Sequence, residues 1–155
     1  MHRTLLPLTF VLALAAPGRA TDLTATGDWA RTIGAGDLQA GAGSDLVETY
    51  ESAEASALLA ISNTGGAVWR VDVRRTDTTW HGNFALLLRR TGDGMGGGPI
   101  SGGAAYQAIG ETNAEFFSGT GDRTNIPVQF ELAGMSVQIP PNTYVTTITY
   151  TVVQL

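Results

Sequence analysis

The sequence contains no cysteine and no lysine. Without cysteine the chain forms no disulfide, and it offers no thiol nucleophile and no thiolate ligand for zinc or an iron–sulfur cluster. Without lysine it forms no Schiff base with a substrate and no lysine–asparagine crosslink. The fold must therefore be held together by packing and hydrogen bonds alone.

Acidic residues outnumber basic ones. The chain has 14 Asp and Glu residues against nine arginines, a formal net charge of −5 at pH 7. An acidic chain is repelled by phosphate backbones and anionic lipid, so we expect no nucleic-acid partner. Arg74-Arg75 and Arg89-Arg90 direct one side chain to each face of a strand. We therefore expect these arginines to pair with nearby acids.

Residues 1–20 have the layout of a secretory signal peptide. Met1-His2-Arg3 is basic, residues 4–16 are mostly apolar, and Pro17-Gly18-Arg19-Ala20 contains the small residues of a cleavage site. The apolar run is shorter than the ~18 residues that a membrane-spanning helix needs. We expect cleavage after Ala20, a single domain over residues 21–155, no membrane span after cleavage, and a secreted protein of the bacterial cell surface or periplasm.

Short runs of β-branched and aromatic residues, separated by Gly, Asn and Asp, predict an all-β fold. The clearest run is residues 144–153, in which Thr, Val, Ile and Tyr alternate between two faces. Apolar residues also alternate with polar ones over residues 68–73 and 126–132, and residues 84–88 are apolar throughout, as in a central strand. We expect an immunoglobulin-like antiparallel β-sandwich of about seven to eight strands.

Glycine-rich segments separate several of these runs. Asn63-Thr64-Gly65-Gly66 lies between residues 58–61 and 68–73 and predicts a hairpin turn. Residues 91–103, of which seven are glycine, predict a long mobile loop.

Two other segments are less regular. Residues 45–60 fit either a helix capped by Ser44 or two strands around a polar turn at residues 51–54, and we favour the strands because the remaining chain is β. Val137 and Ile139 predict a short strand that ends at Pro140-Pro141, because proline cannot donate to a ladder.

Residues 139–150, Ile-Pro-Pro-Asn-Thr-Tyr-Val-Thr-Thr-Ile-Thr-Tyr, resemble the end of secreted bacterial immunoglobulin-like domains. Pilins, spore-coat-U-like proteins and related adhesins often close with a proline, a turn, a Thr-Tyr pair and a Thr/Val-rich strand. The resemblance implies a β-sandwich with a surface or filament role. This chain departs from the chaperone–usher pilins in lacking a disulfide and in placing Tyr150 away from its last residue.

The segment after Ala20 is a candidate assembly strand. Five of its residues fall on one face of an extended chain: Leu23, Ala25, Gly27, Trp29 and Ile33. Such a strand can complete the sheet of a neighbouring subunit, and Gly27 would let two backbones approach closely. The alternative is that this segment is simply the domain's own first strand.

Enzymatic signatures are missing. After Ala20 the only histidine is His81, and a Ser-His-Asp hydrolase would also need a serine on a sharp turn, yet no Gly-x-Ser-x-Gly motif occurs. The glutamates show no spacing that pairs them as a glycosidase requires, so we expect them on the surface. These are Glu48, Glu51, Glu54, Glu111, Glu115 and Glu131. We expect no catalytic residue.

Metal and ligand sites have few candidates. Asp93 and Asp122 each follow a glycine, but neither loop has the spaced acidic ladder of an EF-hand, so we expect no metal and no cofactor. Trp69 lies on the apolar face of its run and predicts core. Trp80, beside His81 in a polar segment, is the candidate for contact with a sugar or protein ligand.

Together these features predict a non-enzymatic extracellular structural subunit of a surface filament, pilus or coat, assembled with itself or with sister subunits by β-strand addition. The alternative is a secreted adhesin or binding module that recognises carbohydrate or protein through its loops.

Overall fold

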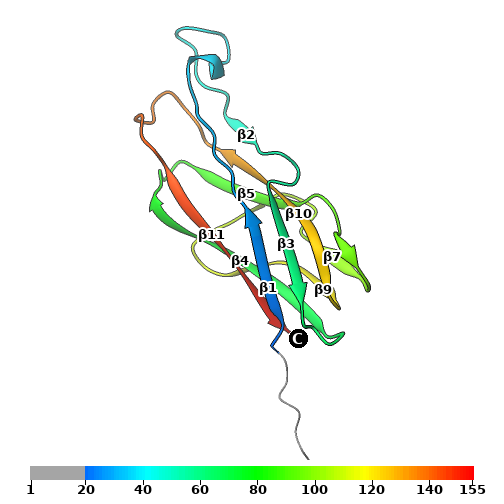
Figure 1. Ribbon diagram of the computed structural model, residues 1–155. Helices are drawn as coiled ribbons and strands as arrows, with labels where there is room; N and C mark the ends of the chain where they lie inside the picture. Colours follow the sequence, from blue (N-terminus) through cyan, green and yellow to red (C-terminus); the bar gives the residue numbers. More distant parts are fainter. Residues whose placement is uncertain (1–19) are drawn as a thin grey trace, which may run out of the picture.

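The computed structural model describes residues 20–155, which form a sandwich of antiparallel β-sheets (Figure 1). The predicted signal peptide, except for Ala20, lies outside the described residues. The described residues form eleven strands, more than the seven to eight expected: seven have six or more residues and four are shorter. The strands are β1 (Asp22–Gly27), β2 (Thr49–Glu51), β3 (Ala57–Ser62), β4 (Val68–Thr79), β5 (Ala85–Arg90), β6 (Met95–Gly96), β7 (Ile100–Gly102), β8 (Gln107–Ala108), β9 (Ala114–Thr120), β10 (Arg123–Ala133) and β11 (Val145–Gln154).

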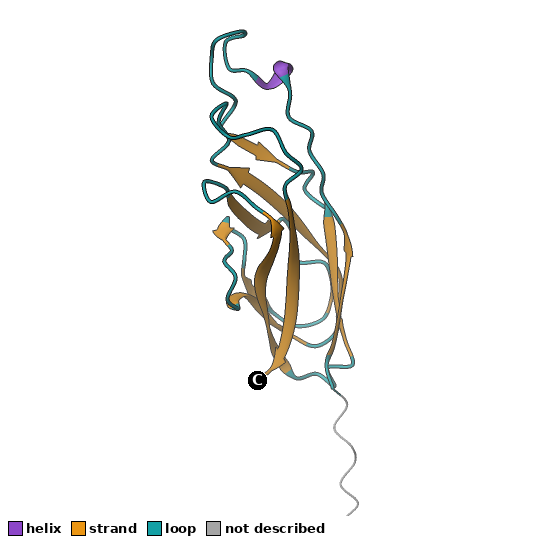
Figure 2. Cartoon of the chain, turned by 90° about the vertical axis from the view of Figure 1, so that its left-hand side faces the viewer, coloured by secondary structure: helices purple, strands orange, loops and turns teal. Residues whose placement is uncertain are grey.

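The two sheets differ in size. The seven-stranded sheet has the order β1-β3-β10-β5-β8, with β2 and β6 also paired to β10, and the four-stranded sheet has the order β11-β4-β9-β7. A side view shows an elongated body with an arm at one end, which carries the short 3-10 helix η1 (Ala35–Asp37) (Figure 2). The predicted all-β antiparallel sandwich is confirmed.

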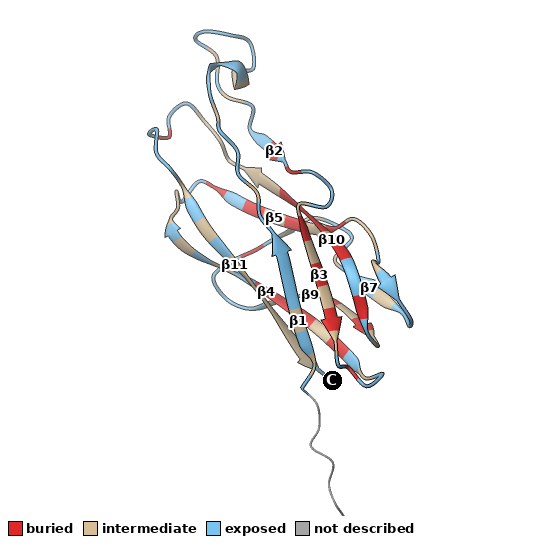
Figure 3. Cartoon of the chain, in the orientation of Figure 1, coloured by how far each residue is buried: buried red, intermediate tan, exposed pale blue. Residues whose placement is uncertain are grey.

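The core lies between the sheets and is built from alternate residues of the long strands. The predicted alternation over residues 68–73 and 126–132 is confirmed for most of their length: Trp69, Val71, Val73, Ile126 and Val128 have no exposed surface and Phe130 is buried, whereas Leu132 is half-buried. These strands meet because each has one apolar face to remove from water. Buried residues concentrate in β3, β4 and β10, whereas β1 and β11 are exposed or half-buried (Figure 3). The residues with no exposed surface are Leu59, Ile61, Trp69, Val71, Val73, Leu88, Ile126 and Val128.

The predicted hairpin at Asn63–Gly66 is wrong. The turn exists, but it carries the chain from one sheet to the other, because β3 pairs with β1 and β10 while β4 pairs with β11 and β9. Thr64 fixes the crossing: its backbone N–H and its hydroxyl both donate to Asp122 Oδ1, at 2.9 and 2.6 Å. These hydrogen bonds lower the pKa of Asp122.

The glycine-rich segment 91–103 is more ordered in structure than a plain loop, which corrects our expectation. It contains β6, which pairs with β10, and β7, which pairs with β9. Two buried arginines hold it. Arg90 Nε donates to Gly102 O at 2.5 Å and its Nη1 pairs with Asp93, while Arg123 donates to the carbonyls of Asp93 and Gly98.

The two less regular segments had opposite outcomes. Residues 45–60 form β2 and the start of β3, so the predicted strands are confirmed. The short strand predicted at Val137 and Ile139 is wrong: these residues form a turn, in which Ile139 N–H donates to Ser136 O at 3.1 Å. Ile139 is buried and Val137 is exposed, so their side chains do not act as a strand face.

Candidate functional site: the free edge of strand β11

Strand β11 forms one edge of the four-stranded sheet. Its residues pair with β4 from Val145 opposite Thr79 to Gln154 opposite Trp69, and within residues 20–155 no strand pairs with its other side. The strand has no charged residue and no proline, and its only register shift is at its start. Natural proteins use charges, prolines and bulges to keep an edge from accepting another strand. β11 lacks these protections over nearly its whole length.

The side chains under this edge are incompletely covered. Ile148, Tyr150 and Val152 point into the sandwich and pack against the core, but they are only half-buried. Their neighbours Val71 and Val73, one strand further in, have no exposed surface. A strand added beside β11 would therefore remove more apolar surface from water.

The Tyr150 hydroxyl is a second sign of an incomplete edge. This oxygen is buried and makes no hydrogen bond within the described residues. Burial also raises the pKa of Tyr150. A buried hydroxyl without a partner costs ~1–3 kcal/mol, so β11 is not optimised for the stability of the isolated domain.

The other sheet edges are shorter. β7 and β8 have three and two residues, and β1 has six, including the charged Asp22. β1 also lies close to one end of β11, where Thr21 Oγ1 donates to Gln154 Oε1 at 3.3 Å. Among the described strands, β11 is therefore the longest edge and the one with the fewest features that oppose pairing.

The predicted assembly strand occupies a place in its own domain. β1 pairs with β3 from Asp22 opposite Ser62 to Gly27 opposite Ala57. At Gly27 the two backbones come so close that a Cβ atom would overlap the carbonyl oxygen of Ser56. The close approach that we expected at Gly27 therefore exists, but within one chain.

The five residues of that predicted strand do not share one environment. β1 ends at Gly27, so Trp29 and Ile33 lie beyond it in the arm. Leu23 and Trp29 pack against the core, and the Trp29 ring stacks on Phe130 with centroids 6.4 Å apart. Ala25 and Gly27 are exposed and Ile33 is half-buried. The described position matches the alternative in which this segment is the domain's own first strand.

The candidate ligand residues Trp80 and His81 belong to an aromatic cluster at the turn between β4 and β5. Trp80 packs edge-on against Phe84 at 5.3 Å and lies under the guanidinium of Arg75 at 5.4 Å. His81 packs against Phe84 and Tyr144 at 5.5 and 6.2 Å. Both residues are half-buried, so only part of either ring can meet a ligand.

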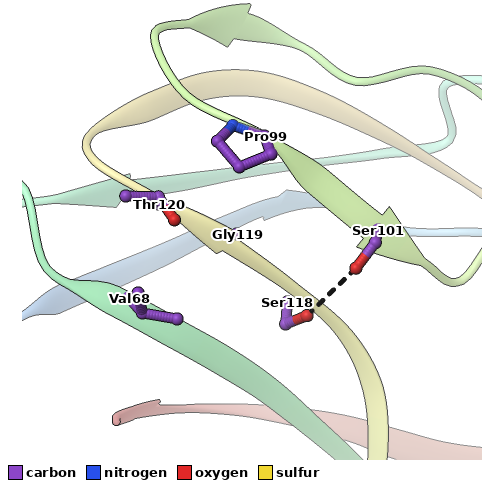
Figure 4. Close-up of a pocket in the computed structure, with 6 residues that line it drawn as sticks. All are labelled: Val68, Pro99, Ser101, Ser118, Gly119 and Thr120. Atoms are coloured by element: carbon purple, nitrogen blue, oxygen red, sulfur yellow. Dashed lines mark hydrogen bonds between the residues drawn. The ribbon is translucent and has the colours of Figure 1, made fainter.

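A shallow depression of about 210 Å³ lies on the four-stranded sheet beside β7 (Figure 4). The hydroxyls of Ser101 and Ser118 are 3.3 Å apart in it. Gly119 lines it with its backbone, and a Cβ at this position would lie 2.6 Å from the buried Trp69 ring. The depression offers hydroxyls and apolar surface but no charged side chain. Its lining residues are Val68, Pro99, Ser101, Ser118, Gly119 and Thr120.

One pair of carboxylates was not predicted from the sequence. Glu51 of β2 lies directly opposite Glu131 of β10. Like charges opposite each other destabilise a sheet, and Tyr106 offsets this by donating its hydroxyl to Glu51 Oε1 at 2.9 Å. Burial and this hydrogen bond raise the pKa of Tyr106 to about 12. Arg89, 4.6 Å above the Tyr106 ring, adds a positive charge to the group.

The candidate calcium ligands have protein partners. Asp93 pairs with Arg90, and Asp122 accepts two hydrogen bonds from Thr64. Within residues 20–155 no three His, Cys, Asp or Glu side chains gather in a way that would hold a metal ion. As expected from the sequence, Trp69 is core, and Arg75 pairs with a nearby acid, Asp77.

Comparison with protein-family models, with curated proteins and with solved structures finds no match to this chain. The part of the chain that the structure describes contains no helix with the length and apolar character to cross a bilayer.

Proposed function

We propose that this protein is a secreted structural subunit of a surface filament, pilus or coat, assembled by addition of a β-strand to the edge of β11. The observation that carries the proposal is this edge: ten residues, uncharged and without proline, paired on one side only within the described chain. The leader-like residues 1–20 support export.

The edge has the chemistry that strand addition needs. In an antiparallel strand alternate residues direct both their N–H and C=O groups to the same side, so about five residues of β11 present these groups outward. Backbone hydrogen bonds then supply affinity, and alternate side chains supply specificity. The half-buried Ile148 and Val152 would gain cover at the same time.

Lysines placed along the edge test the proposal. We expect the double variant Thr147→Lys, Thr151→Lys to be monomeric in sedimentation and to form no filaments under electron microscopy, because edge lysines oppose pairing. The matched control carries the same change on β4, as Thr76→Lys, Thr78→Lys, on exposed residues. Assembly by the edge variant at the wild-type level, or a wild-type protein that stays monomeric, would overturn the proposal.

A secreted binding module is the second candidate, and the depression at Ser101 and Ser118 is the observation that favours it. It predicts saturable binding of a glycan or protein by a monomer. A glycan array probed with Ser118→Val and with Trp80→Ala assigns any binding to the depression or to the aromatic cluster. Absence of saturable binding, together with assembly through β11, rejects this candidate.

A further inference from the structure

The sequence of β11 is nearly its own reverse about Thr149. Reading outward from this residue gives three successive pairs: Ile148 and Tyr150, Thr147 and Thr151, and Thr146 and Val152. Val145 and Val153 close the series. We infer that the strand accepted by β11 is β11 of a second copy of this chain, antiparallel, with the two Thr149 residues opposite each other. This inference rests on the strand addition proposed above and names its partner.

This register matches residues of similar character across the interface. In an antiparallel pair, residues directly opposite each other point to the same face. On the outer face Thr149 meets Thr149, Thr147 meets Thr151 and Val145 meets Val153. On the inner face Ile148 meets Tyr150 and Thr146 meets Val152. Thr–Thr and aromatic–β-branched pairs each contribute roughly 0.2–1 kcal/mol, and the two-fold axis repeats every pair except the central one.

Charge favours a second copy at this edge over most other surfaces. The chain has a net charge of −5, so two copies repel each other wherever acidic surfaces meet. A two-fold contact also places a residue on its axis against itself, which makes a charge there repulsive. β11 has no charge over its ten residues. The nearest charged residues lie one strand away on β4, where Arg70, Asp72, Arg74, Arg75 and Asp77 are opposite Val153, Thr151, Thr149, Ile148 and Thr146.

The contact also covers surface that one copy leaves exposed. The inward residues Ile148, Tyr150 and Val152 are only half-buried at the edge. In the pair, each would gain neighbours from the same strand of the partner. The two four-stranded sheets then join into one sheet of eight strands. Because a two-fold contact closes on itself, it makes a dimer, and the filament or coat proposed above then grows from these dimers through a second contact elsewhere on their surface.

Single-cysteine variants test the register directly, because the chain has no cysteine of its own. They are made in residues 20–155, which contain every described strand. Residues directly opposite each other have Cβ atoms ~4.5–5.5 Å apart, close to disulfide range. We expect Thr149→Cys to give a covalent dimer on mild oxidation. Thr147→Cys and Thr151→Cys should crosslink readily when mixed but poorly alone. Thr76→Cys on β4 is the control and should stay uncrosslinked.

A pair of variants with opposite charges at position 149 tests the same contact through the monomer–dimer equilibrium. Thr149→Arg and Thr149→Glu should each weaken the dimer by at least tenfold, measured by sedimentation, because like charges meet at the axis. Mixing the two variants should restore the dimer, since opposite charges then meet. A partner strand of any other origin gives no such rescue. Circular dichroism of each variant checks that it folds.

The outcomes separate this inference from the proposal beneath it. In one outcome, the double variant Thr147→Lys, Thr151→Lys abolishes the oligomers, but neither the crosslink at position 149 nor the charge rescue is seen. This outcome would support the proposal of strand addition and overturn the inference of self-pairing. A wild-type protein that is monomeric at all concentrations would overturn both. The crosslink together with the rescue establishes the self-paired edge.

Discussion

Replacing Gly27 with alanine tests whether the first strand belongs to its own domain or is given to a neighbour. In the structure β1 pairs with β3, and Gly27 stands opposite Ala57 with φ +103°. Any side chain here meets two obstacles: a backbone conformation that L-residues rarely adopt, and the carbonyl of Ser56. In a monomer both obstacles exist only if β1 docks against β3 of its own chain.

The expected loss of stability follows from these two terms. A non-glycine residue in a sparsely populated region of this kind costs ~1–3 kcal/mol. The added Cβ overlaps rigid backbone rather than a flexible side chain, so β1 must shift away from β3, which costs a further ~1–3 kcal/mol by analogy with overpacking. We therefore expect Gly27→Ala to lower the free energy of unfolding by about 2–6 kcal/mol, a large part of the ~5–15 kcal/mol typical of a domain.

Denaturant unfolding of residues 20–155, followed by tryptophan fluorescence at a protein concentration where the chain is monomeric, measures this change. Gly36→Ala is the matched control, because Gly36 lies in the same N-terminal region with nothing within 4 Å of its would-be Cβ and no positive φ. If Gly27→Ala unfolds within about 1 kcal/mol of the wild type but fails to assemble, β1 acts between subunits and the reasoning above is refuted.

Three further predictions concern single side chains. Tyr150→Phe removes a buried hydroxyl without a partner, so we expect the monomer to gain about 1 kcal/mol in denaturant unfolding, and a loss of stability would show that the hydroxyl is satisfied. Gly119→Ala should lose about 1–3 kcal/mol and alter the fluorescence of Trp69, whose ring is 2.6 Å from the added Cβ; unchanged fluorescence would contradict this. The pKa of Tyr106 is raised from 10.0 to about 12, so the stabilisation from its protonated form is complete below pH 10 and lost as the pH rises to 12. Tyr106→Phe should therefore remove the step near pH 12 in tyrosinate absorbance, and persistence of that step would show that it belongs to another tyrosine.

Local patterns predicted much of the fold because they depend on neighbouring residues only. Successive side chains of a strand point to opposite faces, so the alternation over residues 68–73, 126–132 and 144–153 predicted strands with one buried face. The completely buried Trp69, Val71 and Val73 confirm this for β4.

Pairing between distant strands was beyond these patterns. The turn at Asn63–Gly66 has hairpin chemistry, yet it joins two sheets, and the apolar faces of β3 and β4 both contribute to the core between them. Glu51 and Glu131 are opposite each other because β2 pairs with β10. Beside them, Gln129 donates to the carbonyl of Ser52, a residue 77 positions away in the sequence. The Arg123 contacts that hold residues 91–103 likewise join residues 25 and 30 positions apart.

The sequence by itself determined that this chain is built from strands, where most of them lie, and which residues of each face the core, since these depend on backbone geometry and on the alternation of apolar side chains. The tertiary structure alone decided which strands are neighbours, that β1 completes its own sheet, and that β11 is an open edge. Strand order is a property of long-range packing, in which distant segments compete for the same partners, and no local pattern records the outcome of that competition.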